Sequence, residues 1–296
     1  MQINHPSTAP DYDAGELRSG KLVSKVLAVG REGALNCYRF SLEIAGEETW
    51  VTPCHRHNFD QLRLHLEGEY SFAKDKWVKG LKVGYYPESM HYGPQVRRNN
   101  DKTLNLQFGG ASRDGFMTPR ERRIGYDELM KNGHFEKGSY TWFDAKGKRH
   151  RKEAYEAVWE LMRGRKIVYA KPRYDTLIHM DPDSYEWVKD EANSGVAYKR
   201  LGSFTENCVS VGFIRLDRGA TVSIGKHTAP QLLFVVTGSV SVDVHTHGPE
   251  TGFALDEKEG PAQFKGVDEA QLYFAQLPTF QGDQNVAFPS FQSKAA

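Results

Sequence analysis

The chain has 296 residues and a formal net charge of +1, with 39% hydrophobic, 12% aromatic and 26% charged residues. This is the profile of a globular protein with enough chain for one large domain or two ordinary ones. The near-zero charge gives no reason to expect a nucleic-acid partner or an anionic membrane surface.

Targeting signals and cysteines point to the cytosol. The first residues carry no apolar stretch typical of a signal peptide, and no apolar run reaches the roughly 18 residues of a membrane helix. The three cysteines, Cys37, Cys54 and Cys208, are too few for a disulfide framework in a chain of this length. We therefore expect reduced thiols and a cytoplasmic protein.

The first part of the chain reads as an arm followed by a β-barrel. Residues 1–20 are polar and predict an N-terminal arm. From residue 21 to residue 112, short segments of alternating apolar and polar residues are separated by turns roughly every eight to twelve residues. This rhythm favours a barrel or a sandwich. Strands are predicted at 21–29, 36–44, 61–67, 70–72, 76–78, 83–86 and 103–108.

Residues 113–200 break this rhythm. Pro119 and the basic run after it predict entry into a helix, and residues 139–143 predict a hairpin arm. Residues 152–163 predict a helix, because their apolar residues recur at helical spacing and form one stripe. Gly164 is the expected end of this helix. The segment could bridge two domains or cover the first barrel as a lid. We favour the bridge, because long insertions are usually structural unless a site lies beneath them.

The barrel rhythm returns at 201–296, and it repeats the first unit. Residues 227–238 align with residues 57–68 at a constant offset and keep the histidine at the position of His57, the glutamine, the leucine after it and the final glycine. The position that matches His55 is Gly225, and the turn at 260–266 contains no histidine. We therefore predict that the second unit is a barrel that has lost the site present in the first unit.

The candidate chemistry is concentrated in residues 55–68. His55 and His57 are two residues apart, so on a strand they share a face. His91 follows a second hydrophobic strand. Two imidazoles from one strand and a third from its neighbour can hold a metal from one side and leave positions open for substrate or oxygen.

The strand after the histidines has a polar face. Strand parity places Gln61, Arg63, His65 and Glu67 inward, and the three leucines between them outward. Buried charged groups are costly unless they are paired or used. Arg63 could clamp a carboxylate or a phenolate, and His65 could serve as a general base. The alternative is an internal salt bridge of these residues with Glu67.

Two further residues are candidates for substrate binding. Tyr86 lies on the strand before His91, and its alternative role is core packing. Gln107 lies on the polar face of the last predicted strand, which could instead meet solvent.

The spacing of these residues resembles the metal site of the cupin superfamily. The H-x-H pair, the three-residue gap to Gln61 and the six-residue gap to Gly68 match the first cupin motif. Gln61 stands where the family usually has glutamate, and the turn from Pro87 to His91 is one residue shorter than in the family. The duplication implies a mostly β bicupin with two tandem double-stranded β-helix barrels. We assign an arm at 1–20, an N-terminal barrel with the metal site at 21–112, a helical and hairpin segment at 113–200, and a degenerate C-terminal barrel at 201–296.

The resemblance implies one divalent metal per chain, held by His55, His57 and His91. Fe(II) is favoured over Ni, Zn, Mn, Co or Cu. Gln61 would either bind the metal or hydrogen-bond to bound water or substrate. The implied activity is a dioxygenase that cleaves a small oxygen-chelating substrate, such as a hydroxylated aromatic or a β-dicarbonyl compound. The alternatives are a non-oxidative cupin (isomerase or decarboxylase) and a non-catalytic metal- or ligand-binding cupin. The expected partners are substrate, O₂ and a second copy in a homodimer.

Overall fold

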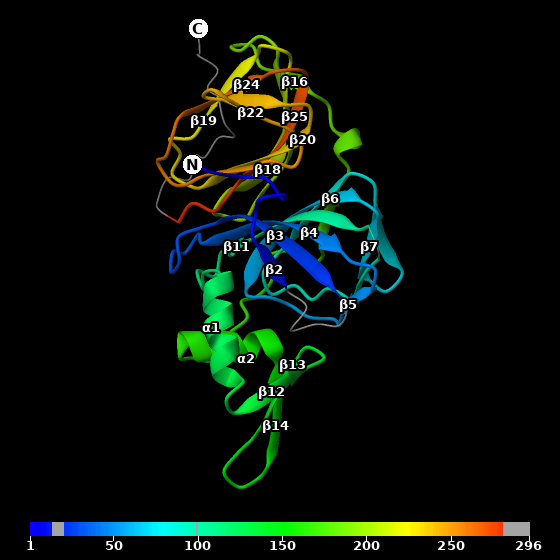
Figure 1. Cartoon of the computed structure of the whole chain (residues 1–296), viewed down its shortest axis with the longest axis vertical. Coiled ribbons are helices and arrows are strands. Elements are labelled where there is room, and N and C mark those ends of the chain that lie inside the picture. Colours follow the sequence, from blue (N-terminus) through cyan, green and yellow to red (C-terminus); the bar gives the residue numbers. More distant parts are fainter. Residues whose placement is uncertain (14–20, 99, 281–296) are drawn as a thin grey trace. The chain divides into compact units, whose positions relative to one another are not determined.

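The computed structural model describes residues 1–13, 21–98 and 100–280, and the chain divides into two compact units (Figure 1). The N-terminal unit is Pro10–Met180, and the C-terminal unit is Asp181–Ala296 together with Met1–Ala9. Both consist mostly of antiparallel β-sheet, as predicted.

The expected N-terminal arm contributes strands to both units. β1 (Gln2–Asn4) pairs with β23 (Gly252–Leu255) in the C-terminal unit. β2 (Asp11–Asp13) pairs with β3 (Leu22–Val29) in the N-terminal unit. The rest of the arm, residues 14–20, lies outside the described residues.

The N-terminal unit is built on two sheets. The larger has the strand order β15-β9-β6-β11-β4-β3-β2, and the smaller has the order β5-β10-β7-β8. The remaining bounds are β4 (Tyr38–Ala45), β5 (Trp50–Thr52), β6 (Phe59–Glu67), β7 (Glu69–Ala73), β8 (Lys76–Lys79), β9 (Lys82–Tyr86), β10 (Gln95–Arg97), β11 (Lys102–Gly109) and β15 (Ile178–Met180). All seven strands predicted between residues 21 and 108 are present.

β6 lies between β9 and β11 and carries the predicted polar face. Gln61 faces Tyr86 on one side and Gln107 on the other in the strand register. Arg63 and His65 are buried on the same face. The parity prediction is wrong for Glu67, which is exposed and lies 2.7 Å from Lys102 Nζ. The cause is an irregular register between Lys102 and Thr103, at the start of β11, which breaks the alternation there.

Residues 113–180 belong to the N-terminal unit. They form α1 (Pro119–Leu129), α2 (Ala154–Arg163) and a three-stranded sheet of β12 (Gly133–Glu136), β13 (Ser139–Phe143) and β14 (Arg149–Glu153). α1 starts with a capping box between Thr118 and Glu121. α2 ends, as predicted, at Gly164, whose φ of 64° is left-handed. Among the described residues, neither helix is long and apolar enough to cross a membrane.

The C-terminal unit has two sheets, ordered β1-β23-β20-β25-β18-β17-β16 and β19-β24-β21-β22. The bounds are a 3₁₀ helix (Pro182–Ser184), β16 (Val188–Lys189), β17 (Val196–Phe204), β18 (Val209–Leu216), β19 (Thr221–Ile224), β20 (Gln231–Thr237), β21 (Val240–Val242), β22 (His245–His247), β24 (Ala262–Gly266) and β25 (Ala270–Gln276).

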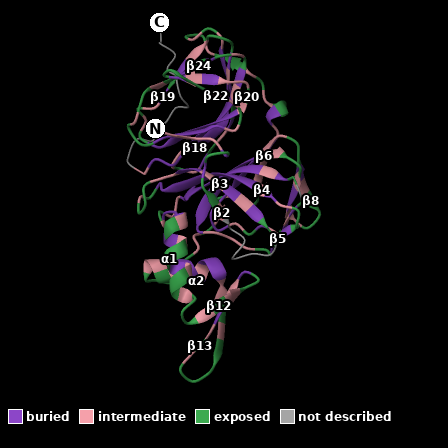
Figure 2. Ribbon diagram, viewed as in Figure 1, coloured by how far each residue is buried: buried purple, intermediate pink, exposed green. Residues whose placement is uncertain are grey.

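The interiors of the two units differ in chemistry, although both are buried (Figure 2). Leu233 and Val235 of β20 pack with Phe253, Phe264 and Phe274 in an apolar cluster. Fully burying one such side chain contributes about 1.5–3 kcal/mol to folding. The corresponding inward positions of β6 hold Arg63 and other polar groups. A polar interior provides no comparable gain in stability, which directs attention to the N-terminal unit as the functional one.

Candidate functional site

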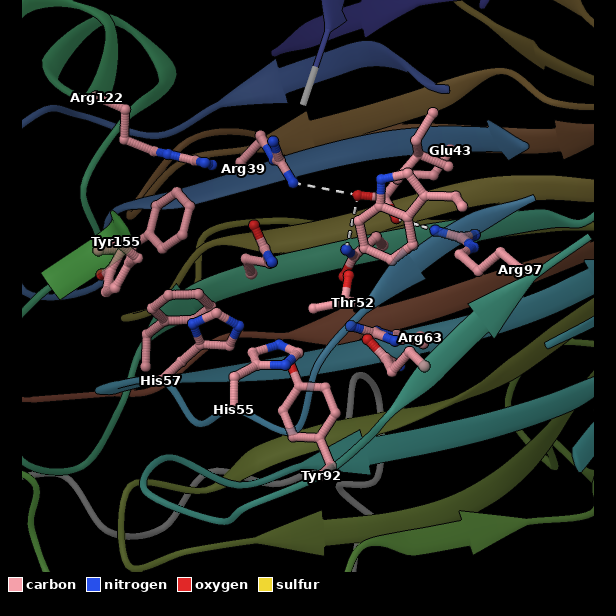
Figure 3. A pocket seen from close by; sticks show the side chains of 17 residues that line it. Arg39, Glu43, Thr52, His55, His57, Arg63, Tyr92, Arg97, Arg122 and Tyr155 are labelled. Atoms are coloured by element: carbon pink, nitrogen blue, oxygen red, sulfur yellow. Dashed lines mark hydrogen bonds and ion pairs between the residues drawn. The ribbon is translucent and has the colours of Figure 1, made fainter. Parts of the chain in front are cut away.

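The N-terminal unit encloses a cavity of about 80 Å³ (Figure 3). A water molecule needs roughly 10–15 Å³ on this measure, so the cavity can hold several waters or one small organic molecule. Its lining residues are Leu22, Arg39, Glu43, Trp50, Thr52, His55, His57, Phe59, Arg63, Tyr92, Gln95, Arg97, Asn105, Gln107, Phe116, Arg122 and Tyr155. Four of the eight predicted site residues are in this set: His55, His57, Arg63 and Gln107.

The histidine pair lies where the sequence predicts, on one side of the cavity. His55 and His57 are half-buried in the connection between β5 and β6, and their rings lie 4.8 Å apart in a T-shaped arrangement. His55 Nδ1 is 2.7 Å from the carbonyl oxygen of Pro53. Because a carbonyl only accepts, Nδ1 carries the proton and Nε2 is the basic nitrogen of the neutral ring.

The third predicted histidine does not join this pair. His91 is exposed and lies outside the cavity lining, whereas the next residue, Tyr92, is buried and lines it. Tyr92 forms a backbone bridge with His55, and its ring lies 4.5 Å from the imidazole. Since neighbouring residues of an extended segment point to opposite sides, an inward Tyr92 turns His91 outward. The shortened turn after Pro87 is the sequence signal for this one-residue shift.

Gln61 is buried behind the cavity wall and is held at both ends of its amide. Its Nε2 donates to the Tyr92 hydroxyl at 2.6 Å. Its Oε1 accepts from Arg63 Nη2 at 3.0 Å and from Gln107 Nε2 at 3.1 Å. The amide oxygen is therefore engaged by two donors and is not presented as a metal ligand.

The donor set does not fit a resident divalent metal. Within the described part of the chain, no three His, Cys, Asp or Glu side chains gather closely enough to hold an ion. Metal sites of this kind use three or four protein ligands, and here two imidazoles are offered. Metal binding stays a prediction, and the expected set of His55, His57, His91 and Gln61 is not assembled.

Arg63 is a buried cation beside the histidines. The residue is 7% exposed, and its guanidinium lies 4.4 Å from the ring centre of Tyr86, with Tyr70 and Tyr92 also within 6.0 Å. Its hydrogen bond to a side chain goes to a neutral amide, and its Nε has no partner among the described residues. Tyr86 itself is fully buried and bonds to the Tyr70 hydroxyl at 2.7 Å. It supports Arg63 from behind and does not line the cavity as a substrate-binding residue.

The other end of the cavity holds a paired charge network. Glu43 accepts from Arg39 at 3.2 Å, from Arg97 at 2.5 Å and from Asn105 at 2.9 Å. Burial alone would raise the pKa of Glu43, but the attraction of Arg97 and Arg39 holds this pKa below its usual range. Glu43 is therefore ionised at neutral pH and balances part of the local positive charge.

His65 belongs to the edge of this network and not to the cavity. Its Nδ1 lies 2.7 Å from the Gly80 carbonyl oxygen, and its Nε2 lies 3.4 Å from Asp101 Oδ2. The ring is fully buried and is not among the lining residues. The predicted catalytic role of His65 is therefore not supported, and its acidic partner is Asp101 instead of the predicted Glu67.

The helical segment covers part of the cavity. Phe116, Arg122 and Tyr155 reach the lining from residues 113–163. Arg122 and Tyr155 are labelled in Figure 3. The Tyr155 hydroxyl donates to Asn58 Oδ1 at 3.0 Å, directly after the histidine pair. This placement favours the lid over the bridge. The spacing within residues 113–163 gave no signal for it, because the contact joins elements that are far apart in sequence.

Hydrogen-bond donors dominate the cavity wall. Four arginines and one glutamate are among the lining residues. Several buried donor atoms of the lining have no partner among the described residues: Arg39 Nε and Nη1, Trp50 Nε1, Arg63 Nε, Gln95 Nε2 and Arg122 Nε. Buried donors normally find acceptors, and arginine cannot accept a hydrogen bond. The cavity thus suits a ligand that carries negative charge and several acceptor oxygens.

Sequence comparisons give no family for this chain. No protein-family model matches it, and no curated protein matches it at a significant level. The evidence from known proteins is therefore structural.

Solved structures share the fold across nearly the whole chain. A candidate dioxygenase from Nostoc punctiforme has a TM-score of 0.62 at 9% identity, over 97% of this chain and 86% of that one. A Bacillus subtilis oxalate decarboxylase with Mn(II) centres has a TM-score of 0.51 at 12% identity, over 97% and 78%. The Ylba protein of E. coli has a TM-score of 0.53 at 7% identity, over 93% and 89%. The chain has the mostly β fold of cupin proteins, as predicted.

Proposed function

We propose that this protein is a bicupin whose N-terminal unit binds a small organic acid and transforms it by acid–base chemistry. The observation that carries the proposal is the buried guanidinium of Arg63. It lines the same cavity as His55 and has no carboxylate within ion-pair distance among the described residues. This arrangement best fits a non-oxidative cupin of the isomerase type.

Binding would centre on charge-assisted hydrogen bonds. A carboxylate or an enolate placed against Arg63 would give the unpartnered Nε an acceptor. A buried charge left without its partner costs about 3–5 kcal/mol, so an anion that supplies the partner gains a comparable advantage over a neutral analogue. Gln107 and Asn105 present amides from β11 on the same wall and would orient the remaining oxygens.

The chemistry would use His55 as the base. In a 2-oxo or 2-hydroxy acid, Nε2 of His55 would take a proton from the carbon next to the carbonyl or carboxylate. The electron pair of the broken C–H bond would move onto oxygen as an enolate, whose charge Arg63 stabilises. Return of the proton from the imidazolium to a different carbon or face gives the isomer.

Oxalate-type decarboxylation fits less well, because Gln61 replaces the acid/base glutamate that the cupin pattern would supply. An iron-dependent dioxygenase is the second candidate. The histidine pair favours it, and the likeness to the Nostoc protein supports it at the level of fold. It requires a third ligand that the described residues do not bring to the pair.

Proton exchange distinguishes the two candidates. Wild-type protein is incubated in D₂O with pyruvate, oxaloacetate, malonate, acetoacetate and salicylate, and carbon-bound deuterium is followed by NMR beside oxygen consumption. We expect exchange into at least one acid to be faster than in a protein-free control, without oxygen uptake. Exchange should be lost in His55→Gln and retained in His227→Gln, the matching control in the C-terminal unit. Oxygen uptake dependent on added Fe(II), with no exchange, would refute the acid–base proposal in favour of the dioxygenase.

A further inference from the structure

Beyond the histidine pair, the positions predicted to complete the metal site are taken by side chains that hydrogen-bond to one another. Tyr92 stands where the third histidine was expected, and Gln61 stands where the cupin pattern has glutamate. These two residues bond to each other at 2.6 Å. The Gln61 oxygen is bonded in turn to Arg63 and to Gln107. The groups that would complete a metal site therefore satisfy one another.

The network brings a permanent positive charge next to the histidine pair. The Arg63 guanidinium carbon is 5.5 Å from the centre of the Tyr92 ring, and the His55 ring is 4.5 Å from the same centre. The two groups are thus within about 10 Å, a distance at which charges interact even across salt solution and more strongly inside a protein. A divalent cation on the histidines would be repelled by Arg63. Arg39 lines the same cavity, but its charge is paired with that of Glu43.

A guanidinium can do part of what a metal does for an anionic substrate. It neutralises a carboxylate and fixes its orientation through two parallel hydrogen bonds. It cannot change oxidation state. Among the described residues no carboxylate lies within ion-pair distance of Arg63; the Tyr70, Tyr86 and Tyr92 rings surround its guanidinium, and Glu43 attracts it from farther away.

We infer that the N-terminal unit works without a metal, and that Arg63 has taken over the electrostatic role of the cation toward a small carboxylate ligand. This inference rests on the proposed function, since it assumes that the ligand is an organic acid.

A Co²⁺ titration tests the inference without relying on activity. Untagged full-length protein, stripped with chelator, is titrated with Co²⁺ and followed by visible absorption and calorimetry. Wild type should show no saturable site at micromolar Co²⁺. Arg63→Met should bind Co²⁺ at least about tenfold more tightly, because the repulsive charge is removed. His57→Ala in the Arg63→Met background should abolish that gain, and this double variant is the control for location.

Ligand binding to the same stripped protein gives the second readout, with oxaloacetate as the probe. The affinity should stay within twofold when excess chelator is present. One Co²⁺ per wild-type chain, lost in His57→Ala, would overturn the inference, and so would acid binding that appears only after metal is added. If the proposed function itself is wrong, the result is a different one: no acid binds to the protein, whether it is stripped or loaded with metal. That result would also remove the ligand role assigned to Arg63.

Discussion

Asp60 offers a sharp test of how the site is supported. It is fully buried on β6, where its Oδ1 accepts from the Glu88 backbone N–H at 2.7 Å and its Oδ2 accepts from the Tyr85 hydroxyl at 3.1 Å. Through Glu88 it anchors the turn that leads to Tyr92. Arg173 pairs with Glu88 at 2.7 Å, and Tyr174 packs against Tyr85.

The environment of Asp60 makes stability depend on pH. Burial, with the repulsion of Glu88 as a second cause, raises the pKa of Asp60 from 3.8 to about 7. The folded protein therefore binds more protons than the unfolded chain between these two values. The free energy of unfolding falls as the pH rises through this window, by about 4 kcal/mol in total. About 2.5 kcal/mol of that loss lies between pH 5 and pH 8.

The substitution Asp60→Asn removes this titration and keeps an oxygen to accept from Glu88. Urea unfolding of both proteins at pH 5, 6, 7 and 8 gives the difference in the free energy of unfolding. We expect this difference to move in favour of Asp60→Asn by about 2.5 kcal/mol between pH 5 and pH 8. Asp127→Asn, at a half-exposed carboxylate paired with Arg123, is the control and should show no such trend. A pH-independent difference for Asp60→Asn would refute the reasoning.

Three further predictions concern the site and its cover. His91→Ala should leave oxaloacetate affinity unchanged within twofold and should contain no more or less metal than the metal-free wild type. A three-histidine site would instead hold metal in wild type and lose it in this variant; calorimetry of oxaloacetate binding and elemental analysis of both proteins distinguish the two. Tyr155→Phe should lower the free energy of unfolding by about 1–2 kcal/mol in urea titrations, because Asn58 Oδ1 loses its buried donor; an unchanged value would mean that the helical segment is not held by this bond. Gly164→Ala should cost about 1 kcal/mol, from the left-handed φ alone, since no atom lies within 4 Å of an added Cβ; a melting temperature unchanged within error would contradict it.

Much of the N-terminal unit could be predicted from sequence because its signals are local. Alternation along β6 correctly placed Gln61, Arg63 and His65 inward, and the apolar stripe with its final glycine located α2. The same rule failed at Glu67, where the register of the neighbouring strand shifts. Parity holds only as long as the pairing is regular.

The composition of the site was harder to predict because it depends on how distant segments meet. A one-residue shortening of the turn after Pro87 exchanges His91 for Tyr92, and no property of His91 itself shows this. Arg39 and Glu43 were accessible to the same parity argument, since they alternate with the apolar residues of β4. Tyr155 reaches the cavity from a helix almost 100 positions beyond the histidines, and local periodicity carries no information about such a contact.

The assignment of this cavity as an organic-acid site is tested most directly by calorimetric titration of oxaloacetate into chelator-treated protein. Wild type is compared with Arg63→Met, and Lys199→Met of the C-terminal unit is the control. Arg63 bonds to the neutral amide of Gln61 and has no carboxylate within ion-pair distance among the described residues, so Arg63→Met leaves no anion without its direct partner and should remain folded. We predict saturable binding by wild type and by Lys199→Met, and a loss in Arg63→Met of about 2 kcal/mol or more, which is roughly 30-fold in affinity. Equal binding by all three proteins would contradict the assignment of this cavity as an organic-acid site.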